Sequence, residues 1–373
     1  MENNLYAYKP SYAIHPGEYI EELLETFGMS QTELSIRLGV TPKHLSNLIN
    51  GKVSLTFELA NALEKVFNGY SAKYWISLQT AYSFFEKNRR IEAQIEEKKQ
   101  VYNEWLDQFD YNNLVKMGYV IEHDRAKTTA AKINNVLTFF GCSDIESWNN
   151  LYCSNLPAAC RISGPSFAKI GNTSAWIRFG QNCAQQLSED IPQYNKTKFK
   201  RTLRLIKGLT VDTTCGFDEK MKEFCKNVGV ILLFVKEIPR SGICGAAYWV
   251  NGNSTPCIQM SLRFKKNDHF WFTFFHEAAH ILKEHKKVVY LDCDTIENTD
   301  VENEADKLSG DFLIPPTEYE QFIKRGRFYK SDIISFAQQI GIHPGIVVGR
   351  LQHDEKIKWS WHNSLKATFT WKD

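Results

Sequence analysis

The chain of 373 residues is long enough for two or three domains, and 43% hydrophobic with 24% charged residues is a globular composition. A formal net charge of +2 argues against a protein that binds nucleic acid through its overall charge, so any such surface has to be local. The nine cysteines include no Cys-x-x-Cys pair and no apolar run approaches membrane-spanning length, so we expect reduced thiols in a cytoplasmic protein that neither enters nor crosses a membrane.

Residues 15–85 have the pattern of five short helices. The segment Ser30-Gln-Thr-Glu33 is a capping box that opens the second helix. Thr41 is in the N-cap position of the third helix, Pro42 is its first residue, and Asn50 with the following glycine closes it. A short helix, a glycine-containing turn and a short polar-faced helix are typical of a helix-turn-helix domain.

In such a domain the third helix offers side chains to base edges in the major groove, and residues around it bind phosphates. We therefore predict a DNA-contact surface made of Gln31, Thr41, Pro42, Lys43, His44, Asn47, Asn50 and Lys52. Through residue 95 the segment has nine lysines and arginines against ten glutamates, a net charge of about −1 that is not the usual basic footprint. A helical interaction module therefore stays open as an alternative.

The order IHPGEYIEELLETFGMSQTELSIRLGVTPKHLSNLINGK, followed by YWISLQTAY, closely resembles the HigA-type antitoxins of the Xre-like helix-turn-helix family. The resemblance covers about residues 12–85. It implies binding to a double-stranded DNA operator as a homodimer, with a toxin as a further candidate partner.

Residues 86–110 continue as a charged helix, which we interpret as a connector or dimer arm. From there to about Gly208 the pattern is helical and contains no catalytic spacing. We therefore predict a helix-turn-helix domain at 1–90, a helical connector at 91–215 and a third domain at 216–373.

The periodicity changes at Phe217, where a helix is followed by an apolar strand at 230–235. Residues 244–262 then predict a β-hairpin with its turn at Asn251-Gly252. Residues 330–351 have a second helix-turn-helix outline, whose apolar faces indicate packing on the core rather than contact with DNA. The predicted fold class is α+β, mostly α.

His276-Glu-Ala-Ala-His280 is an H-E-x-x-H pattern. Residues four apart lie on one face of a helix, so the two imidazoles can bind one Zn²⁺ while Glu277 lies beside them to activate water. The neighbouring residues are apolar nearly all round, which predicts a buried helix. Burying three ionisable groups costs free energy unless they are paired, so a metal site would explain why they are there. The alternative is two core histidines and a salt-bridged glutamate.

A zinc site of this type needs a third protein ligand. Residues 299–315 predict a helix whose apolar stripe is Val301, Ala305, Leu308 and Phe312. At 100° per residue Glu304 borders that stripe, whereas Glu302 and Asp306 point away. Glu302 also forms a capping box with Thr299. The predicted zinc ligands are therefore His276, His280 and Glu304.

The motif HEAAH followed by ENEADKLSGDFLIP resembles the ImmA/IrrE family of metallopeptidases, and the middle region resembles that of such proteases fused to a HigA-like domain. The resemblance implies a zincin-like fold and an intracellular protease that cleaves a repressor, a toxin or the chain itself. We therefore expect a DNA-binding transcriptional regulator with a zinc endopeptidase, in which Glu277 is the catalytic base. An antitoxin-type repressor with a non-catalytic zinc sensor and a protein-interaction scaffold remain alternatives.

Overall fold

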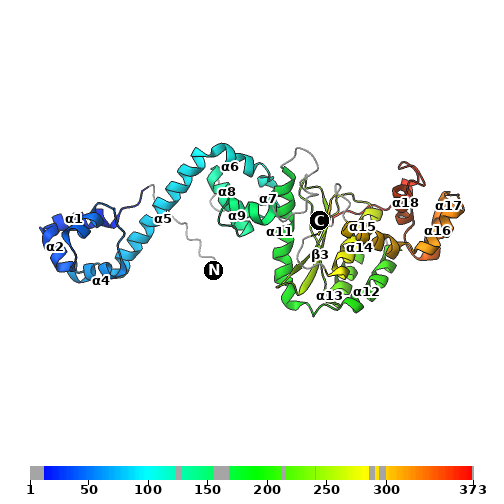
Figure 1. Ribbon diagram of the computed structural model, residues 1–373, viewed down its shortest axis with the longest axis horizontal. Coiled ribbons are helices and arrows are strands. Elements are labelled where there is room, and N and C mark those ends of the chain that lie inside the picture. The colour runs from blue at the N-terminus through cyan, green and yellow to red at the C-terminus, as the bar shows by residue number, and fades with distance from the viewer. Residues whose placement is uncertain are drawn as a thin grey trace. The chain divides into compact units, whose positions relative to one another are not determined.

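The computed structural model describes residues 12–122, 128–153, 168–211, 216–239, 241–284, 290–293 and 300–371. The chain divides into two compact units, Met1–Gln100 and Val101–Asp373, whose elements are labelled in Figure 1. The predicted connector at 91–215 falls mostly within the second unit, and its predicted end at residue 215 lies outside the described residues. None of the helices in the described ranges is long and apolar enough to span a membrane.

The first unit has the five predicted helices, α1 (Pro16–Phe27), α2 (Gln31–Leu38), α3 (Pro42–Ile49), α4 (Phe57–Val66) and α5 (Ala72–Glu97). The hydroxyl of Ser30 accepts from the backbone N–H of Glu33, and the hydroxyl of Thr41 accepts from that of His44, so both predicted N-caps are confirmed. The carboxylate of Glu33 accepts from Arg37 on the next turn. Leucines from all three of the first helices meet Trp75 of α5 in one core.

The middle helices are α6 (Lys99–Leu106), α7 (Tyr111–Lys116), α8 (Thr129–Phe140), α9 (Ile145–Trp148), α11 (Ala168–Leu187), α12 (Lys196–Gly208) and α13 (Phe217–Lys226). Trp105, Trp148 and Trp176 from this region share one core with Ile231 and Tyr248 of the sheet. The middle region is therefore packed on the C-terminal sheet, which explains why it belongs to the second unit.

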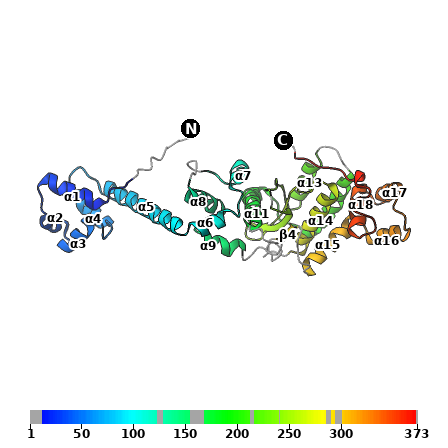
Figure 2. The same ribbon diagram turned by 90° about the horizontal axis from the view of Figure 1, so that it is seen from above.

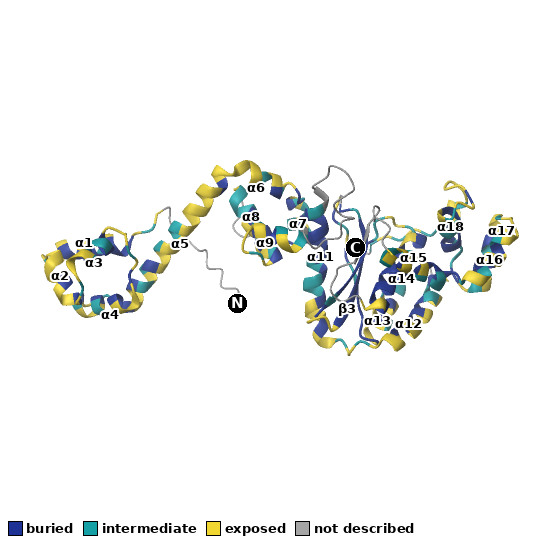
Figure 3. Ribbon diagram, viewed as in Figure 1, coloured by how far each residue is buried: buried dark blue, intermediate teal, exposed yellow. Residues whose placement is uncertain are grey.

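The sheet consists of β1 (Ile231–Phe234), β2 (Ile243–Val250), β3 (Thr255–Met260) and β4 (Tyr290–Cys293), in the order β1-β3-β2-β4. β2 pairs antiparallel with β3 and β4, whereas β1 runs parallel to β3. Asn251 and Gly252 have positive φ angles of 53° and 62°, as the predicted hairpin turn requires. Both faces are covered, and Figure 3 shows β2 and β3 as mostly buried.

Side chains alternate across the sheet, so each face has its own core. Ala246 and Tyr248 pack with residues of α6 to α11, whereas Ala247 and Ile258 pack with α12, α13 and α14 (Asn267–Lys283). Figures 1 and 2 show α11 and α14 on opposite sides of the strands. Helix α14 is buried nearly all round, as its sequence predicts.

The remaining helices are α15 (Asp300–Leu313), α16 (Pro316–Lys324), α17 (Lys330–Ile340) and α18 (Pro344–His353). Helix α18 packs closely on α14 at two glycines. A methyl group added at Gly345 would lie 2.7 Å from Oδ1 of Asn267, and one added at Gly349 would lie 2.7 Å from Oδ2 of Asp268. The second helix-turn-helix outline therefore packs on the core, as predicted, and its last helix is largely buried.

Candidate functional site

Three ligand atoms from α14 and α15 meet at one point. Nε2 of His276 lies 3.0 Å from Nε2 of His280, and Oε2 of Glu302 lies 3.1 Å from the first and 3.4 Å from the second. Ligands at about 2.0–2.1 Å from a tetrahedral zinc ion are about 3.3–3.4 Å apart. The three atoms therefore have nearly the spacing of three corners of a zinc site, with His276 and His280 placed as the sequence predicts.

The second nitrogen of His276 is oriented by a carboxylate. Its Nδ1 lies 2.9 Å from Oδ1 of Asp306, so a proton on Nδ1 donates to Asp306 and leaves the lone pair of Nε2 directed at the other two ligand atoms. A carboxylate on the far nitrogen is the usual support for a metal-binding histidine. Asp306 is therefore placed to support His276 in the candidate metal site.

The structure places Glu302, and not the predicted Glu304, beside the two histidines. Its carboxylate is half exposed and forms an ion pair with Lys283, whereas Glu302 bonds to both histidines. The buried face of α15 is Ala305, Ser309, Gly310 and Leu313, which differs from the predicted apolar stripe. Ser309 donates to the backbone carbonyl of Phe272, so a small polar residue lies in the face that meets α14, beside Phe312, whose ring stacks on Phe275. The predicted N-cap, Thr299, lies outside the described residues.

Glu302 remains ionised in this environment. Burial raises the pKa of its carboxyl group, but the contacts with the side chains of His276 and His280 outweigh burial and lower that pKa to about 2. The side chain is only 14% exposed, so little water reaches the charge. An anionic oxygen beside two imidazoles is a donor set that suits a divalent cation.

Glu277 is fully buried on the sheet side of α14. A methyl group at Gly245 of β2 would lie 2.9 Å from its Oε1 and 2.6 Å from Cγ2 of Thr273. The pairing of β2 with β4 shifts register between Ile243 and Gly245, so the strand is irregular where it meets this carboxylate. Within the described ranges, the group of residues able to hold an ion is His276, His280 and Glu302, which leaves Glu277 beside the ligands, as predicted.

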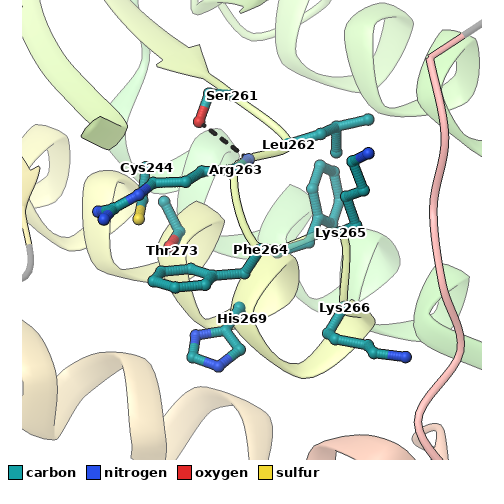
Figure 4. Close-up of a pocket in the computed structure, with 10 residues that line it drawn as sticks. Cys244, Ser261, Leu262, Arg263, Phe264, Lys265, Lys266, His269 and Thr273 are labelled. Atoms are coloured by element: carbon teal, nitrogen blue, oxygen red, sulfur yellow. Dashed lines mark hydrogen bonds between the residues drawn. The ribbon is translucent and has the colours of Figure 1, made fainter. Parts of the chain in front are cut away.

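A small pocket adjoins the same helix one turn before Glu277. Figure 4 shows Thr273 between Cys244 and Phe264 in this pocket. The ring of Phe264 stacks on His269 with centroids 4.4 Å apart, and the guanidinium carbon of Arg263 lies 4.9 Å from the centroid of Phe264. This basic and aromatic surface is not among the predicted sites, although the run Arg-Phe-Lys-Lys at 263–266 is a signal for it.

In the first unit, α3 carries Lys43, His44 and Asn47 at positions i, i+1 and i+4, which place them on neighbouring parts of one surface. Lys43 is exposed, and His44 and Asn47 are half-buried. Thr41, Pro42, Gln31 and Lys52 are also exposed at the ends of α2 and α3. Asn50 differs from these residues, because its side-chain amide donates to the carbonyl of Ser46 at 2.7 Å and closes α3.

A family model for helix-turn-helix domains matches residues 20–75. The helix-turn-helix-type transcriptional regulator YddM of Escherichia coli (strain K12) is 34% identical over 78 residues, which are 21% of this chain and 82% of that protein. Virulence-associated protein A of Dichelobacter nodosus is 33% identical over 75 residues, which are 20% of this chain and 74% of that protein. A solved structure of the Pseudomonas aeruginosa antitoxin HigA with the higBA promoter is 29% identical, over 23% of this chain and 94% of that one, with a TM-score of 0.21. Through its N-terminal domain the chain therefore belongs to the helix-turn-helix family.

Proposed function

We propose that this protein is a DNA-binding transcriptional regulator whose second unit is a zinc-dependent endopeptidase, acting on a regulatory protein such as a repressor or toxin, or on the chain itself. The regulator is supported by the helix-turn-helix match and by a relative named as a transcriptional regulator. The peptidase is supported by one observation, the three ligand atoms of His276, His280 and Glu302 that lie 3.0–3.4 Å apart beside a buried carboxylate.

In this proposal His276, His280 and Glu302 hold Zn²⁺, and Asp306 orients His276. When bound, zinc polarises the scissile carbonyl group and lowers the pKa of its water to about 7. Glu277 would take a proton from the attacking water at its carboxylate and pass that proton to the leaving amine. Its packing against Gly245 keeps the carboxylate in place during both transfers.

The test of the peptidase is the change Glu277→Gln, which preserves the shape of the side chain but removes the base. Wild type and variant are expressed beside candidate partner proteins, and cleavage is followed by mass spectrometry. Because a positioned base contributes roughly 10²–10⁴-fold, we expect the variant to lose cleavage while keeping its zinc. Glu304→Gln, on the exposed side of α15, is the matched control and should cleave as wild type does. Equal cleavage by Glu277→Gln and wild type would contradict the mechanism.

The second candidate function is a non-catalytic zinc sensor within an antitoxin-type repressor. The burial of the ligands favours it, since His276 is 3% exposed and His280 2% exposed. Structural zinc sites are closed, whereas catalytic sites keep one position open. Under this alternative Glu277→Gln leaves regulation in cells unchanged, and loss of Glu302 abolishes it.

For the first unit we propose binding of a palindromic double-stranded DNA operator by a homodimer, through the surface of α3 that carries Lys43, His44 and Asn47. Asn47→Ala should change sequence preference at a cost of about 1–3 kcal/mol, because it faces base edges. Lys52→Ala should weaken binding to all sequences and lower the salt slope by about 1. If no duplex from the genomic neighbourhood binds at low salt, the domain is an interaction module instead.

A further inference from the structure

A pocket of about 420 Å³ lies in the second unit, between α8, α11 and the loop that follows α7. We call it the α8–α11 pocket, and the side chains that matter for its chemistry are Tyr119, Thr138, Phe139, Phe179, Asn182 and Gln186. Its volume is within the range of small-molecule sites in proteins. It lies on the α11 side of the sheet, whereas the metal centre lies on the α14 side.

One wall of the pocket is aromatic. The rings of Tyr119 and Phe179 are parallel to within 7°, with centroids 4.0 Å apart. The ring of Phe139 is tilted by only 24° from that of Tyr119 at 6.4 Å. Ring planes that share an orientation favour a flat ligand that continues the stack, because offset stacking is a preferred arrangement of aromatic groups.

The polar side chains of the pocket are uncharged. Asn182 and Gln186 are one turn apart on α11, and Thr138 precedes Phe139 on α8. A carboxamide offers a donor and an acceptor in one plane and can therefore pair with the edge of a nitrogen heterocycle. Within the described residues, the side chains that line the pocket carry no formal charge, so the site is suited to a neutral ligand rather than a phosphate or carboxylate.

A neighbouring face of α11 is bonded to the sheet. The side chain of Gln259 on β3 donates to the carbonyl of Trp176 at 2.9 Å and accepts from the hydroxyl of Tyr248 on β2 at 2.8 Å. Gln259 also fills the space beside Gly180, where a methyl group would collide with it. The same strand, β2, carries Gly245 against Glu277. One helix therefore connects the pocket with the strand that supports the buried carboxylate.

We propose that the α8–α11 pocket binds a small, uncharged, planar nitrogen heterocycle of the nucleobase or nucleoside type, and that this ligand stabilises α11 and strand β2. The aromatic wall stacks on the ring, and Asn182 and Gln186 bond to its edge. This inference does not depend on zinc, because among the described residues the pocket shares no side chain with the metal centre.

The test is isothermal titration calorimetry on the full-length Glu277→Gln chain, so that the result is independent of peptidase activity. The probes are adenine, hypoxanthine, uracil and cytosine, their nucleosides, and the corresponding monophosphates. We expect at least one neutral probe to bind, and its monophosphate to bind roughly tenfold more weakly, because the described lining offers no cation to a phosphate. Absence of binding by every neutral probe, or preference for the monophosphates, would overturn the proposal.

A matched pair of variants tests the location. Gln186→Ala should weaken binding roughly tenfold, the effect of losing one hydrogen bond in a partly buried site. Gln181 lies on the same helix but does not line the pocket, so Gln181→Ala should bind as wild type does. Equal effects of the two changes would exclude the α8–α11 pocket as the binding site.

Hydrogen exchange measured by mass spectrometry tests whether ligand binding in the pocket stabilises β2 as well as α11. At saturating ligand we expect slower exchange in α8, in α11 and in β2, with α4 of the first unit as the unchanged reference. Slower exchange in α8 and α11 without any change in β2 would support the site and overturn the proposed link to the strand.

Discussion

Gly245 of β2 and Glu277 of α14 are in direct contact, since a methyl group on the glycine would lie 2.9 Å from Oε1 of the glutamate. Only a residue without a side chain allows the strand to approach the helix this closely. The position of the buried carboxylate is therefore determined as much by the strand as by the motif that carries it.

The first prediction is that Gly245→Ala destabilises the second unit. The added methyl group has to displace Thr273 or Glu277, which we expect to cost about 1–3 kcal/mol of unfolding free energy and to reduce any cleavage activity. Thermal unfolding of the full chain measures the effect. Gly208→Ala is the control, because no atom of the described residues lies within 4 Å of the position of its methyl group. Equal stability of the two variants would contradict this prediction, because it would show that the protein accommodates a methyl group at Gly245 without displacing Thr273 or Glu277.

The second prediction concerns the third zinc ligand. Glu302→Ala removes the oxygen that lies 3.1 Å from Nε2 of His276, so the purified variant should contain little zinc. Glu304→Ala removes only an ion pair with Lys283 at the surface and should keep its zinc. Elemental analysis of both proteins decides the question, and zinc loss in Glu304→Ala alone would restore the ligand set expected from the sequence.

The third prediction is that Asp306→Asn weakens zinc binding by about 10–100-fold without abolishing it, because the carboxylate supports His276 and does not itself contact the ion. Competition with a chromogenic chelator measures the affinity. Asp311→Asn, on the same helix, serves as the control. If zinc affinity is unchanged in Asp306→Asn, the contact between Asp306 and His276 has no role in the centre.

The fourth prediction is that the first unit loses stability in mild acid because of His15. Nδ1 of His15 accepts from the backbone N–H of Gly17 at 2.9 Å and caps α1, which requires a neutral ring. Burial lowers the pKa of this histidine below 6.5, and the charge of Glu18 opposes the shift only in part. Below a pH of about 6.5 the unfolded chain therefore binds a proton that the folded chain does not.

The stabilisation from His15 is thus fully present above pH about 6.5 and decreases as the pH falls toward the lowered pKa. Hydrogen exchange, expressed as protection factors for α1–α3 at pH about 7.5 and about 5.5, measures it. His15→Asn keeps a capping oxygen but does not titrate, so its protection should depend less on pH. Equal pH dependence in wild type and variant would assign the effect to another group.

Local signals made much of the structure predictable from the sequence. The caps at Ser30 and Thr41 bond to backbone groups three residues away, so they define the helix-turn-helix helices without help from the rest of the chain. The Asn251-Gly252 turn likewise identifies the β2–β3 hairpin.

The difference between the carboxylate expected beside the histidines, Glu304, and the one found there, Glu302, has another origin. The rotation of α15 about its axis depends on which residues meet α14, and Ser309 does so through its hydrogen bond to the carbonyl of Phe272. A search of the sequence for large hydrophobic residues does not identify a contact made by a serine. Each residue turns the helix by about 100°, so a change in the face that is expected to meet α14 changes which glutamate points toward the histidines. The predicted apolar stripe directed Glu304 toward them, whereas the observed face directs Glu302.

The sequence by itself determined the elements and the residues that lie within one helical turn of each other, including His276 and His280, because the geometry of a single helix is the same in every protein. The tertiary structure alone decided which side chains from distant segments meet: Glu302 and Asp306 at the histidines, Gly245 at Glu277, and the middle helices on the sheet. These contacts depend on how closely two elements pack, and packing distance is determined by residues on both partners at once.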